Sequence, residues 1–278
     1  MNTPSYYLLG VRINPLDILE LNALVGEMIN SDKHCIIASR NLHSIYIYHH
    51  DAKMQTFSTR AQYMRVDSMP IVLLGKLLGY PLRRKHRVTY VDWIYPLMAE
   101  ATRQNWRIFY LGSKPDVVEC GASILHQKFP GLQIETTDGY FDATAGSAEN
   151  HKILEKINLY QPDVLMVGMG MPRQEHWILD NLECIDANVI LTCGACMDYI
   201  AGAIPTPPRW MGKVGLEWLY RLWTEPKRLW QRYLIEPWFV AKLFLEDIWT
   251  YFKPRKKSIF LDKFNPEEEL KIKNQKLR

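Results

Sequence analysis

The chain has 278 residues, of which 47% are hydrophobic and 23% charged, and its formal net charge is +4; these are the proportions of a globular protein that forms one large α/β domain or two small ones. No apolar run approaches the roughly 20 residues that cross a bilayer, no secretory signal pattern opens the chain, and five cysteines do not suggest a disulfide framework. The composition predicts a cytoplasmic protein with reduced cysteines, and it leaves association with a membrane surface open.

Strand and helix patterns alternate along the body of the chain. The first half is predicted to hold a strand at 6–13, a helix at 15–30, a strand at 34–38, a helical stretch opened by 39–43, a strand at 63–66 and a helix at 68–78. A basic loop at 83–87 follows, and then a helix that Asp92 caps and that ends near 105. The rest of the body is predicted to hold four strands, at 107–111, 132–137, 163–167 and 187–192. A helix follows each of these strands, at 115–129, at 147–160, from Gln174 and at 194–201. This alternation predicts an α/β, Rossmann-like fold with a mainly parallel sheet and helices on both faces.

Ligands of such folds bind outside the carboxyl ends of the strands. The polar residues that directly follow each predicted strand are therefore the candidate site. They are Ser39, Asn41, Asp67, 112–114, Asp138, 168–174 and 193–198.

The pattern changes after Gly202, where the chain becomes basic and aromatic. Residues 204–257 hold eleven lysines and arginines against five acidic residues, whereas residues 1–203 hold 18 against 21. Six of the nine tryptophans fall between Trp210 and Trp249. Two Glu-Pro pairs predict breaks between helices at 213–224, 226–235 and 237–252. We predict three parts: an α/β core at 1–203, a helical appendage at 204–253 and a charged, flexible tail at 254–278.

The appendage admits several functions. Its basic and aromatic residues suit a membrane surface, a lid over the active site, or simple packing against the body. A nucleic-acid arm is disfavoured, because no nucleic-acid module precedes it.

Two motifs after predicted strands have competing interpretations. Gly168-Met-Gly-Met-Pro172 has half of a dinucleotide fingerprint, but the third glycine is missing, which disfavours an NAD site; the turn still suits a phosphate or carboxylate oxygen at a helix N-terminus, or no ligand at all. Cys193-Gly-Ala-Cys196 has the placement of a thiol–disulfide pair, but a close turn that needs small residues explains it better.

Asp67 follows a short strand, where an aspartate serves either as a helix cap or as a general base. The sequence has no Asp-x-Asp pair, the usual holder of a metal that binds a nucleotide diphosphate. Arginines, backbone amides and helix N-termini would then have to bind such a ligand.

Taken together, the motifs resemble the WecG/TagA/CpsF family of bacterial glycosyltransferases (glycosyltransferase family 26), which build polysaccharides on polyprenyl-linked acceptors. The resemblance runs from about Tyr6 to Tyr233. It rests on Ser39-x-Asn41, Val66-Asp67, Arg87-Val-Thr89, 109–115, 138–141, 167–175, 208–211, 215–221, Glu225-Pro226 and Arg228.

The resemblance implies inverting, metal-independent transfer from a UDP-sugar, with no cofactor. The donor would carry N-acetylmannosamine or its uronic acid, and the acceptor a sugar on undecaprenyl diphosphate. It implies that the appendage docks the protein on the inner face of the cytoplasmic membrane and closes the site. Self-association stays open.

The same resemblance suggests individual roles. Asp67 would deprotonate the acceptor hydroxyl. The substrate-binding residues would be Ser39, Asn41, Arg87, Gly112, Gly168, Gly170, Gln174, Arg209, Arg221, Arg228 and Arg232.

The sequence departs from the family pattern in four places. Ser39 replaces a threonine, Arg40 is a bulky charge inside the motif, Met69-Pro70 replaces a glycine-rich continuation, and 193–196 replaces a Gly-Gly turn. We expect these departures to reshape the donor or acceptor pocket, so glucose, galactose and glucuronic acid remain alternative donor sugars.

Overall fold

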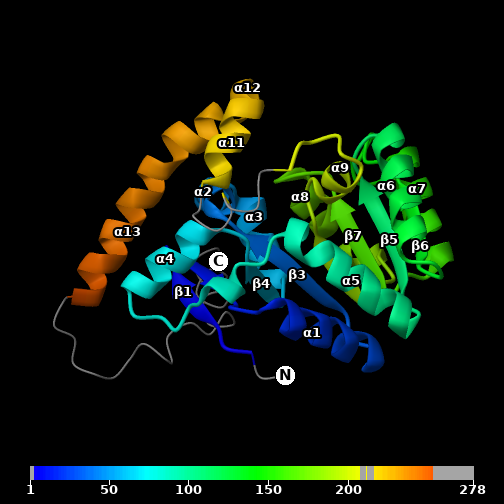
Figure 1. Cartoon of the computed structure of the whole chain (residues 1–278), viewed down its shortest axis with the longest axis horizontal. Helices are drawn as coiled ribbons and strands as arrows, with labels where there is room; N and C mark the ends of the chain where they lie inside the picture. Colours follow the sequence, from blue (N-terminus) through cyan, green and yellow to red (C-terminus); the bar gives the residue numbers. More distant parts are fainter. Residues whose placement is uncertain (1–2, 207–210, 212–215, 253–278) are drawn as a thin grey trace, which may run out of the picture.

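The body of the protein is a six-stranded parallel sheet (Figure 1). The computed structural model describes residues 3–206, 211 and 216–252. The strands lie in the order β4-β3-β8-β7-β5-β6, and every neighbouring pair is parallel. They are β3 (Cys35–Arg40), β4 (Tyr63–Val66), β5 (Arg107–Gly112), β6 (Gln133–Thr137), β7 (Val164–Gly168) and β8 (Val189–Thr192).

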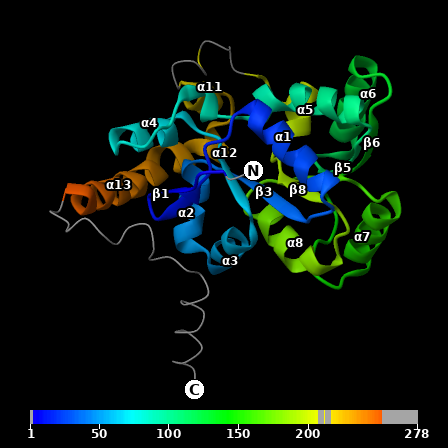
Figure 2. The same cartoon turned by 90° about the horizontal axis from the view of Figure 1, so that it is seen from below.

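Helices cover both faces of this sheet (Figure 2). One face packs against α1 (Ile18–Asn30), α5 (Tyr90–Gln104), α6 (Pro115–Lys128) and α9 (Cys196–Ile200), and the other against α3 (Ala52–Arg60), α7 (Ala148–Tyr160) and α8 (Arg173–Asn181). Successive residues of β3 alternate between the two apolar cores, with Cys35 and Ile37 in one and Ile36 and Ala38 in the other. Because β7 and β8 are buried along their whole length, they consist mostly of apolar residues. The predicted α/β Rossmann-like fold is confirmed.

A third apolar cluster lies beside the sheet and joins the N-terminal hairpin to the last described helix. It contains residues of β1 (Tyr6–Leu8), β2 (Val11–Ile13), α2 (Leu42–His50) and α4 (Met69–Leu77), and Val240 of α13 (Glu236–Phe252) packs into it. The strand predicted at 6–13 is wrong, since β1 and β2 form an antiparallel hairpin. Leu9 and Gly10 make its two-residue turn with φ of 56° and 73°, the backbone that a tight hairpin of this hand requires.

The C-terminal helices rise beside the carboxyl ends of β3 and β4 (Figure 1). They are α11 (Glu217–Thr224), α12 (Pro226–Trp230), a π-helical turn (Gln231–Ile235) and α13. The break predicted at Pro226 is present, but the one at Pro237 is wrong. There the helix continues through the π-helical turn, in which Glu236 N–H donates to the Gln231 carbonyl five residues earlier. A widened turn leaves room for a proline ring inside a helix. The start predicted at 213 and the tail at 254–278 lie outside the described residues.

Three further features differ from the prediction: the start of α2, a helix that was missed, and the N-cap of α5. Strand β3 continues to Arg40, so helix α2 begins at Leu42 rather than at Ser39. A separate helix, α3, was missed; its cap Asp51 accepts from the N–H groups of Lys53 and Met54. Asp92 lies in the first turn of α5 instead of capping it, and the Thr89 hydroxyl at the N-cap donates to its carboxylate. Short 3₁₀ turns occur at Arg84–His86 and Leu182–Cys184.

Candidate active site

The carboxyl ends of the strands form one continuous edge, as the sequence predicted. Hydrogen bonds between backbone groups tie the residues that follow the strands to their neighbours. Asp67 N–H donates to the Arg40 carbonyl at 2.8 Å, Cys193 N–H to Val167 at 2.8 Å, and Ser113 N–H to Gly168 at 3.3 Å. The candidate residues therefore stand on a rigid backbone, where positions are better fixed than on a free loop.

Asp67 directly follows β4 and lies among arginines. Its side chain is 24% exposed, and Arg65 Nη1 lies 3.9 Å from Oδ1. Burial raises the pKa of this carboxyl group, and the charges of Arg65, Arg87, Arg232 and Arg221 only partly offset that effect. The net result is a pKa above the ordinary aspartate value, which strengthens a carboxylate as a proton acceptor.

Sequence reasoning missed Arg65. Its side chain is fully buried, donates to the Val88 carbonyl and lies 4.4 Å from the centre of the Tyr90 ring. The signal that could have found Arg65 was its spacing from Asp67, because side chains two residues apart on a strand point to the same side. Arg65 and Asp67 have that spacing.

The loop that carries Arg87 runs alongside β4. Val88 N–H donates to the Val66 carbonyl at 2.9 Å, and Arg87 forms a bridge with Val66. Arg87 Nη1 lies 3.6 Å from an Asp92 oxygen, and its charge also acts on Asp67. The structure thus brings the predicted Arg87 to the predicted base.

Two more of the predicted arginines, Arg221 and Arg232 of the C-terminal helices, act on Asp67 through their charge. Burial lowers the pKa of Arg221, but the electrostatic effect of its neighbours is larger, so the net pKa is raised. These neighbours are Tyr199, Tyr233 and two carboxylates, one of them Asp67. For Arg232, burial and the nearby charge of Arg221 lower the pKa, against Tyr233, Glu236 and Asp67. Within the described part of the chain, the buried Arg221 Nε has no hydrogen-bond partner.

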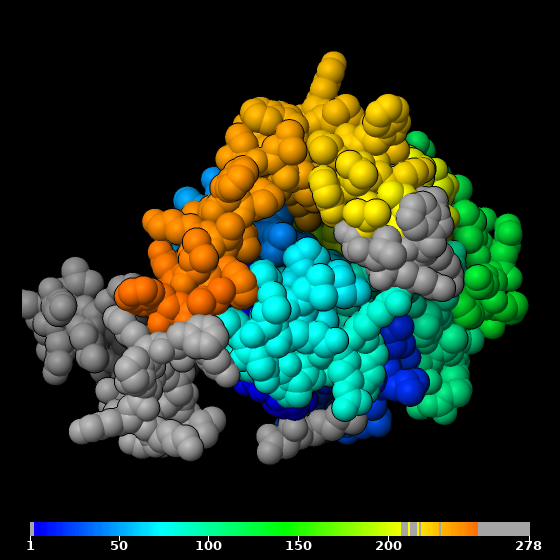
Figure 3. All heavy atoms as spheres, turned by 60° about the vertical axis from the view of Figure 1, so that its left-hand side comes forward, coloured from blue at the N-terminus to red at the C-terminus, as the bar shows by residue number. Residues whose placement is uncertain are grey.

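The surface of the protein is hollowed where the C-terminal helices meet the rest of the chain. Figure 3 shows a recess between the C-terminal helices and α4, with residues of the early, blue part of the chain visible in its depth. Tyr199 of α9, whose pKa is raised by burial against the charge of Arg221, is a further neighbour that the sequence did not single out. Of the other predicted arginines, Arg228 belongs to α12 with its side chain outside the described part, and Arg209 lies outside the described residues.

Ser39 and Asn41 lie next to this arginine cluster. Ser39 is paired with Arg65 in the sheet, and its N–H donates to the Thr192 hydroxyl at 3.2 Å. Asn41 caps α2 through its side-chain oxygen, which accepts from Ser44 N–H at 2.9 Å. Arg40 lies away from this arginine cluster, and its effect on the donor or acceptor pocket stays a prediction. Its side chain lies on the opposite face of the sheet, where it donates to the Ser58 hydroxyl at 2.9 Å.

The remaining predicted residues form a second set at the end of β5, at the end of β7 and in the turn and first residues of α8 that follow β7. A side chain on Gly168 would lie 2.7 Å from the Gly194 carbonyl oxygen, and one on Gly112 would lie 2.7 Å from Gly168 Cα. Gly170 has open space but a φ of 81°. These glycines are therefore needed for close backbone packing and for a turn. Their contact with a substrate stays a prediction.

Gln174 is buried, and both ends of its amide are used within the protein. Its Nε2 donates to Glu175 Oε1 at 2.8 Å, and its Oε1 accepts from Gly194 N–H at 3.1 Å. This pairing fixes the turn after β8 relative to the turn after β7. Its role toward a donor or acceptor stays a prediction.

Cys193 and Cys196 are both buried and unpaired. Burial raises the pKa of each thiol, whereas a reactive thiol needs a lowered pKa and access to solvent. The geometry contradicts the thiol–disulfide alternative and supports the close turn.

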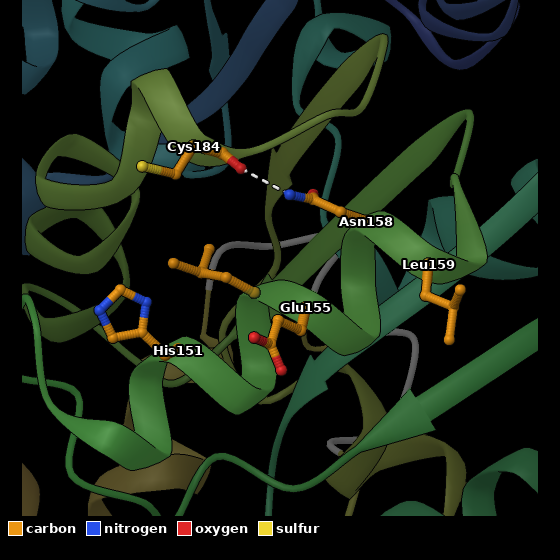
Figure 4. Close-up of a pocket in the computed structure, with 6 residues that line it drawn as sticks. His151, Glu155, Asn158, Leu159 and Cys184 are labelled. Atoms are coloured by element: carbon orange, nitrogen blue, oxygen red, sulfur yellow. Dashed lines mark hydrogen bonds between the residues drawn. The ribbon is translucent and has the colours of Figure 1, made fainter.

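Figure 4 shows a cavity that none of the predicted site residues lines. It measures about 560 Å³ and is bounded by α7 and the 3₁₀ turn Leu182–Cys184, where Asn158 Nδ2 donates to the Cys184 carbonyl at 2.8 Å. The lining residues precede β7 and β8, toward the amino ends of the strands. Within the described residues, no helix is long and apolar enough to cross a membrane, and no group of three His, Cys, Asp or Glu side chains could hold a metal ion.

A parallel α/β sheet with a carboxylate and several arginines at its carboxyl edge suits an anionic ligand such as a phosphate group. Comparison with known proteins gives the family. A protein-family model described as "Glycosyl transferase WecG/TagA/CpsF family" matches residues 6–253 of the sequence. The chain therefore belongs to that family.

Similar relatives occur in Staphylococcus aureus strains NCTC 8325 / PS 47, COL and MRSA252. Each is named N-acetylglucosaminyldiphosphoundecaprenol N-acetyl-beta-D-mannosaminyltransferase. Each is 26% identical over 231 residues, which cover 82% of this chain and 88% of the relative.

Proposed function

We propose that this protein transfers a sugar from a UDP-sugar to a saccharide carried on polyprenyl diphosphate, with inversion and without a metal ion. The observation that carries the proposal is Asp67, which directly follows β4 at the carboxyl edge of the sheet with Arg65 Nη1 3.9 Å from its Oδ1. The charges of Arg87, Arg221 and Arg232 also act on it. The names of the relatives support N-acetylmannosamine as the transferred sugar and N-acetylglucosamine on undecaprenyl diphosphate as the acceptor. Glucose, galactose and glucuronic acid are the alternative donor sugars.

In this proposal the reaction is a single displacement. Asp67 accepts the proton of the acceptor hydroxyl, and the hydroxyl oxygen forms a bond to the anomeric carbon. The bond from that carbon to the diphosphate breaks on the opposite face, and its electron pair leaves with UDP. Attack opposite the leaving group inverts the anomeric centre.

The departing UDP needs cationic groups that are already in place. Arg221 and Arg232 supply such groups near Asp67, and guanidinium groups match the oxygens of a diphosphate. The proposed independence from metal rests on these arginines.

We further propose that the C-terminal helices contact the inner face of the cytoplasmic membrane. Trp223, Trp238 and Trp249 are 87%, 78% and 68% exposed. Tryptophans among basic residues suit the interface between water and lipid headgroups. A lipid-linked acceptor would then reach the recess in Figure 3 from the membrane.

Replacing Asp67 by asparagine tests the chemistry. A general base contributes about 10²–10⁴-fold to a rate, so Asp67→Asn is expected to lower kcat/KM by at least about 100-fold. The assay follows UDP release from UDP-N-acetylmannosamine with a short polyprenyl-diphosphate-linked N-acetylglucosamine. Asp116→Asn, an exposed position on α6, is the matched control. Wild-type turnover by Asp67→Asn would remove Asp67 from the role of base.

Chelation by EDTA tests the metal-free part of the proposal separately. Activity is expected to persist in EDTA. A loss that Mn²⁺ restores would contradict the proposal while leaving the role of Asp67 intact.

A further inference from the structure

Helix α4 has an apolar face that the rest of the described chain does not cover. Its nine residues include one charged side chain, Lys76. Ile71 and Val72 are buried in the third apolar cluster, whereas Leu73 and Leu77, one turn apart on the same side of the helix, are 53% and 73% exposed. A surface helix normally carries polar residues on the side opposite the core. Two leucines on that side indicate a contact with a partner that has an apolar part.

The turn that follows α4 is basic and is fixed against the helix. This basic turn is residues 83–85, and its three side chains are exposed. Leu82, the residue before it, packs beside Gly75 of α4, where any larger residue would clash with the Leu82 side chain. His86 N–H closes the turn on the Arg83 carbonyl at 2.9 Å. The basic side chains are therefore held next to α4 by a rigid backbone.

Positive charge accompanies the leucines along this whole segment. Residues 68–91 contain five lysines and arginines and no aspartate or glutamate. Lys85 is paired with Asp17 at 2.8 Å. Lys76 and the two arginines of the basic turn are exposed, and no ion pair within the described part of the chain uses them. These three cations are available to an anionic partner.

The segment adjoins the C-terminal helices. The two lie on either side of the recess in Figure 3 and share the third apolar cluster. Both are also bonded to the N-terminal hairpin. The Tyr80 hydroxyl, just after α4, donates to the Tyr7 carbonyl at 2.7 Å, and Leu9 N–H donates to Asp247 of α13 at 2.6 Å. The exposed leucines of α4 and the exposed tryptophans of the C-terminal helices therefore belong to neighbouring elements around one opening.

This combination of side chains matches a bilayer surface that contains anionic lipids. Apolar side chains enter the headgroup region, while the long stems of lysine and arginine carry their charges to the phosphates. A second copy of the chain fits less well, because a twofold contact through this surface would bring like charges together. The tryptophans across the recess favour the same lipid partner.

We propose that α4 and the basic turn form a second membrane-contact surface, which binds the headgroups of anionic phospholipids beside the recess. The inference rests on the proposed function, which places the acceptor in a membrane. The basic turn leads directly to Arg87 of the candidate site, whose N–H donates to the Arg84 carbonyl at 3.0 Å. Contact at this turn therefore brings the bilayer to the edge of the site.

Flotation of the full-length protein with vesicles tests this surface through two double variants. On vesicles of phosphatidylglycerol and phosphatidylcholine in equal parts, Arg83→Gln with Arg84→Gln should bind about 25-fold more weakly, because each basic residue near an anionic surface strengthens binding about fivefold. On phosphatidylcholine alone this variant should bind as the wild type does. Leu73→Ser with Leu77→Ser should weaken binding to the anionic vesicles at least about tenfold, because two leucines leave the headgroup region.

Matched controls make the same kinds of change at exposed positions on other elements. Lys33→Gln with Lys152→Gln removes two cations. Leu19→Ser with Leu159→Ser removes two leucines that are 79% and 87% exposed. Both controls should float as the wild type does. Wild-type flotation of either test variant, or an equal loss in its control, would overturn the inference.

Sedimentation velocity tests the second copy of the chain as the partner. A wild-type dimer that Leu73→Ser with Leu77→Ser converts to a monomer, with flotation unchanged, would assign the surface to self-association instead. Thermal unfolding shows whether each variant folds. Where the leucine pair does not fold, Leu77→Ser alone repeats the test with Leu159→Ser as its control.

UDP release separates the inference from the proposed function. With a short acceptor in solution, both test variants should keep the wild-type kcat/KM. A loss there would place these residues in the candidate site and overturn their assignment to the membrane. Absence of transfer by the wild type would refute the proposed function, whereas flotation would still decide whether this surface binds lipid.

Discussion

Replacing the buried Glu175 by glutamine should change how the stability of the protein depends on pH. Glu175 is 1% exposed, and one of its oxygens accepts from Gln174 Nε2. The other oxygen, Oε2, has no hydrogen-bond partner among the described residues. Burial raises the pKa of this carboxyl group from 4.5 to about 7, although Gln174 and the charge of Arg40 oppose the rise.

The sign and size of the effect follow from proton linkage. Below pH 4.5 both the folded and the unfolded chain keep the proton on Glu175. Between pH 4.5 and about 7 the unfolded chain releases that proton while the folded chain retains it, so the free energy of unfolding falls as the pH rises. Each pKa unit corresponds to about 1.36 kcal/mol. The shift of Glu175 therefore removes roughly 3 kcal/mol of stability by pH 8.

Urea unfolding at pH 4.5, 6, 7 and 8, followed by tryptophan fluorescence, measures this difference. Glu175→Gln keeps an acceptor for Gln174 but cannot ionise, so relative to the wild type it should gain roughly 3 kcal/mol between the lowest and highest pH. The wild-type carboxyl group attracts Arg40 only when it is ionised, so this attraction is already contained in its pKa and adds no separate effect. Glu119→Gln, exposed on α6, is the control. A wild-type minus variant difference that does not change with pH would refute the reasoning.

Two further predictions concern the strand-end turns and the membrane. Gly168→Ala should destabilise the protein by about 1–3 kcal/mol through overpacking, because the added carbon would press on Gly194. Gly170→Ala should cost only about 1–2 kcal/mol, because its φ is positive. Urea unfolding that ranks Gly170→Ala as the less stable variant would contradict this account. Trp223→Ser with Trp238→Ser should reduce flotation with anionic vesicles, while Leu159→Ser, an equally exposed site on α7, should not. Equal flotation of all three proteins would argue against membrane contact through the C-terminal helices.

The sheet and its carboxyl edge could be predicted because their signals are local. Buried strands such as β7 are short apolar runs, and the polar residues after them mark where the strands end. The hairpin turn at Leu9 and Gly10 was missed because apolar residues flank it and give one continuous strand pattern. Arg65 was missed for a related reason. A fully buried arginine inside a strand is recognised only when the partners that satisfy it are known, and Tyr90 and Val88 come later in the chain.

The contacts of the C-terminal helices lie beyond any local pattern. Nδ1 of His43 lies 2.9 Å from a Glu236 carboxylate oxygen although the two residues are 193 positions apart, and a Glu-Pro pair normally predicts a break. The π-helical turn before Pro237 removes that break, and it contains Arg232, whose charge acts on Asp67. Neither the continuity of the helix nor the partner of Glu236 follows from the spacing of the residues.

These contacts also determine which experiments are informative. Val240 of α13 is buried in the third apolar cluster with residues of the hairpin and of α4. A chain that stopped at residue 203 would expose that cluster, so a loss of activity or of membrane binding could come from unfolding alone. Substitutions such as Arg232→Gln or Trp238→Ser leave Val240 and Asp247 in place. They therefore separate the chemical and membrane roles of the C-terminal helices from their part in the fold, which a truncation does not.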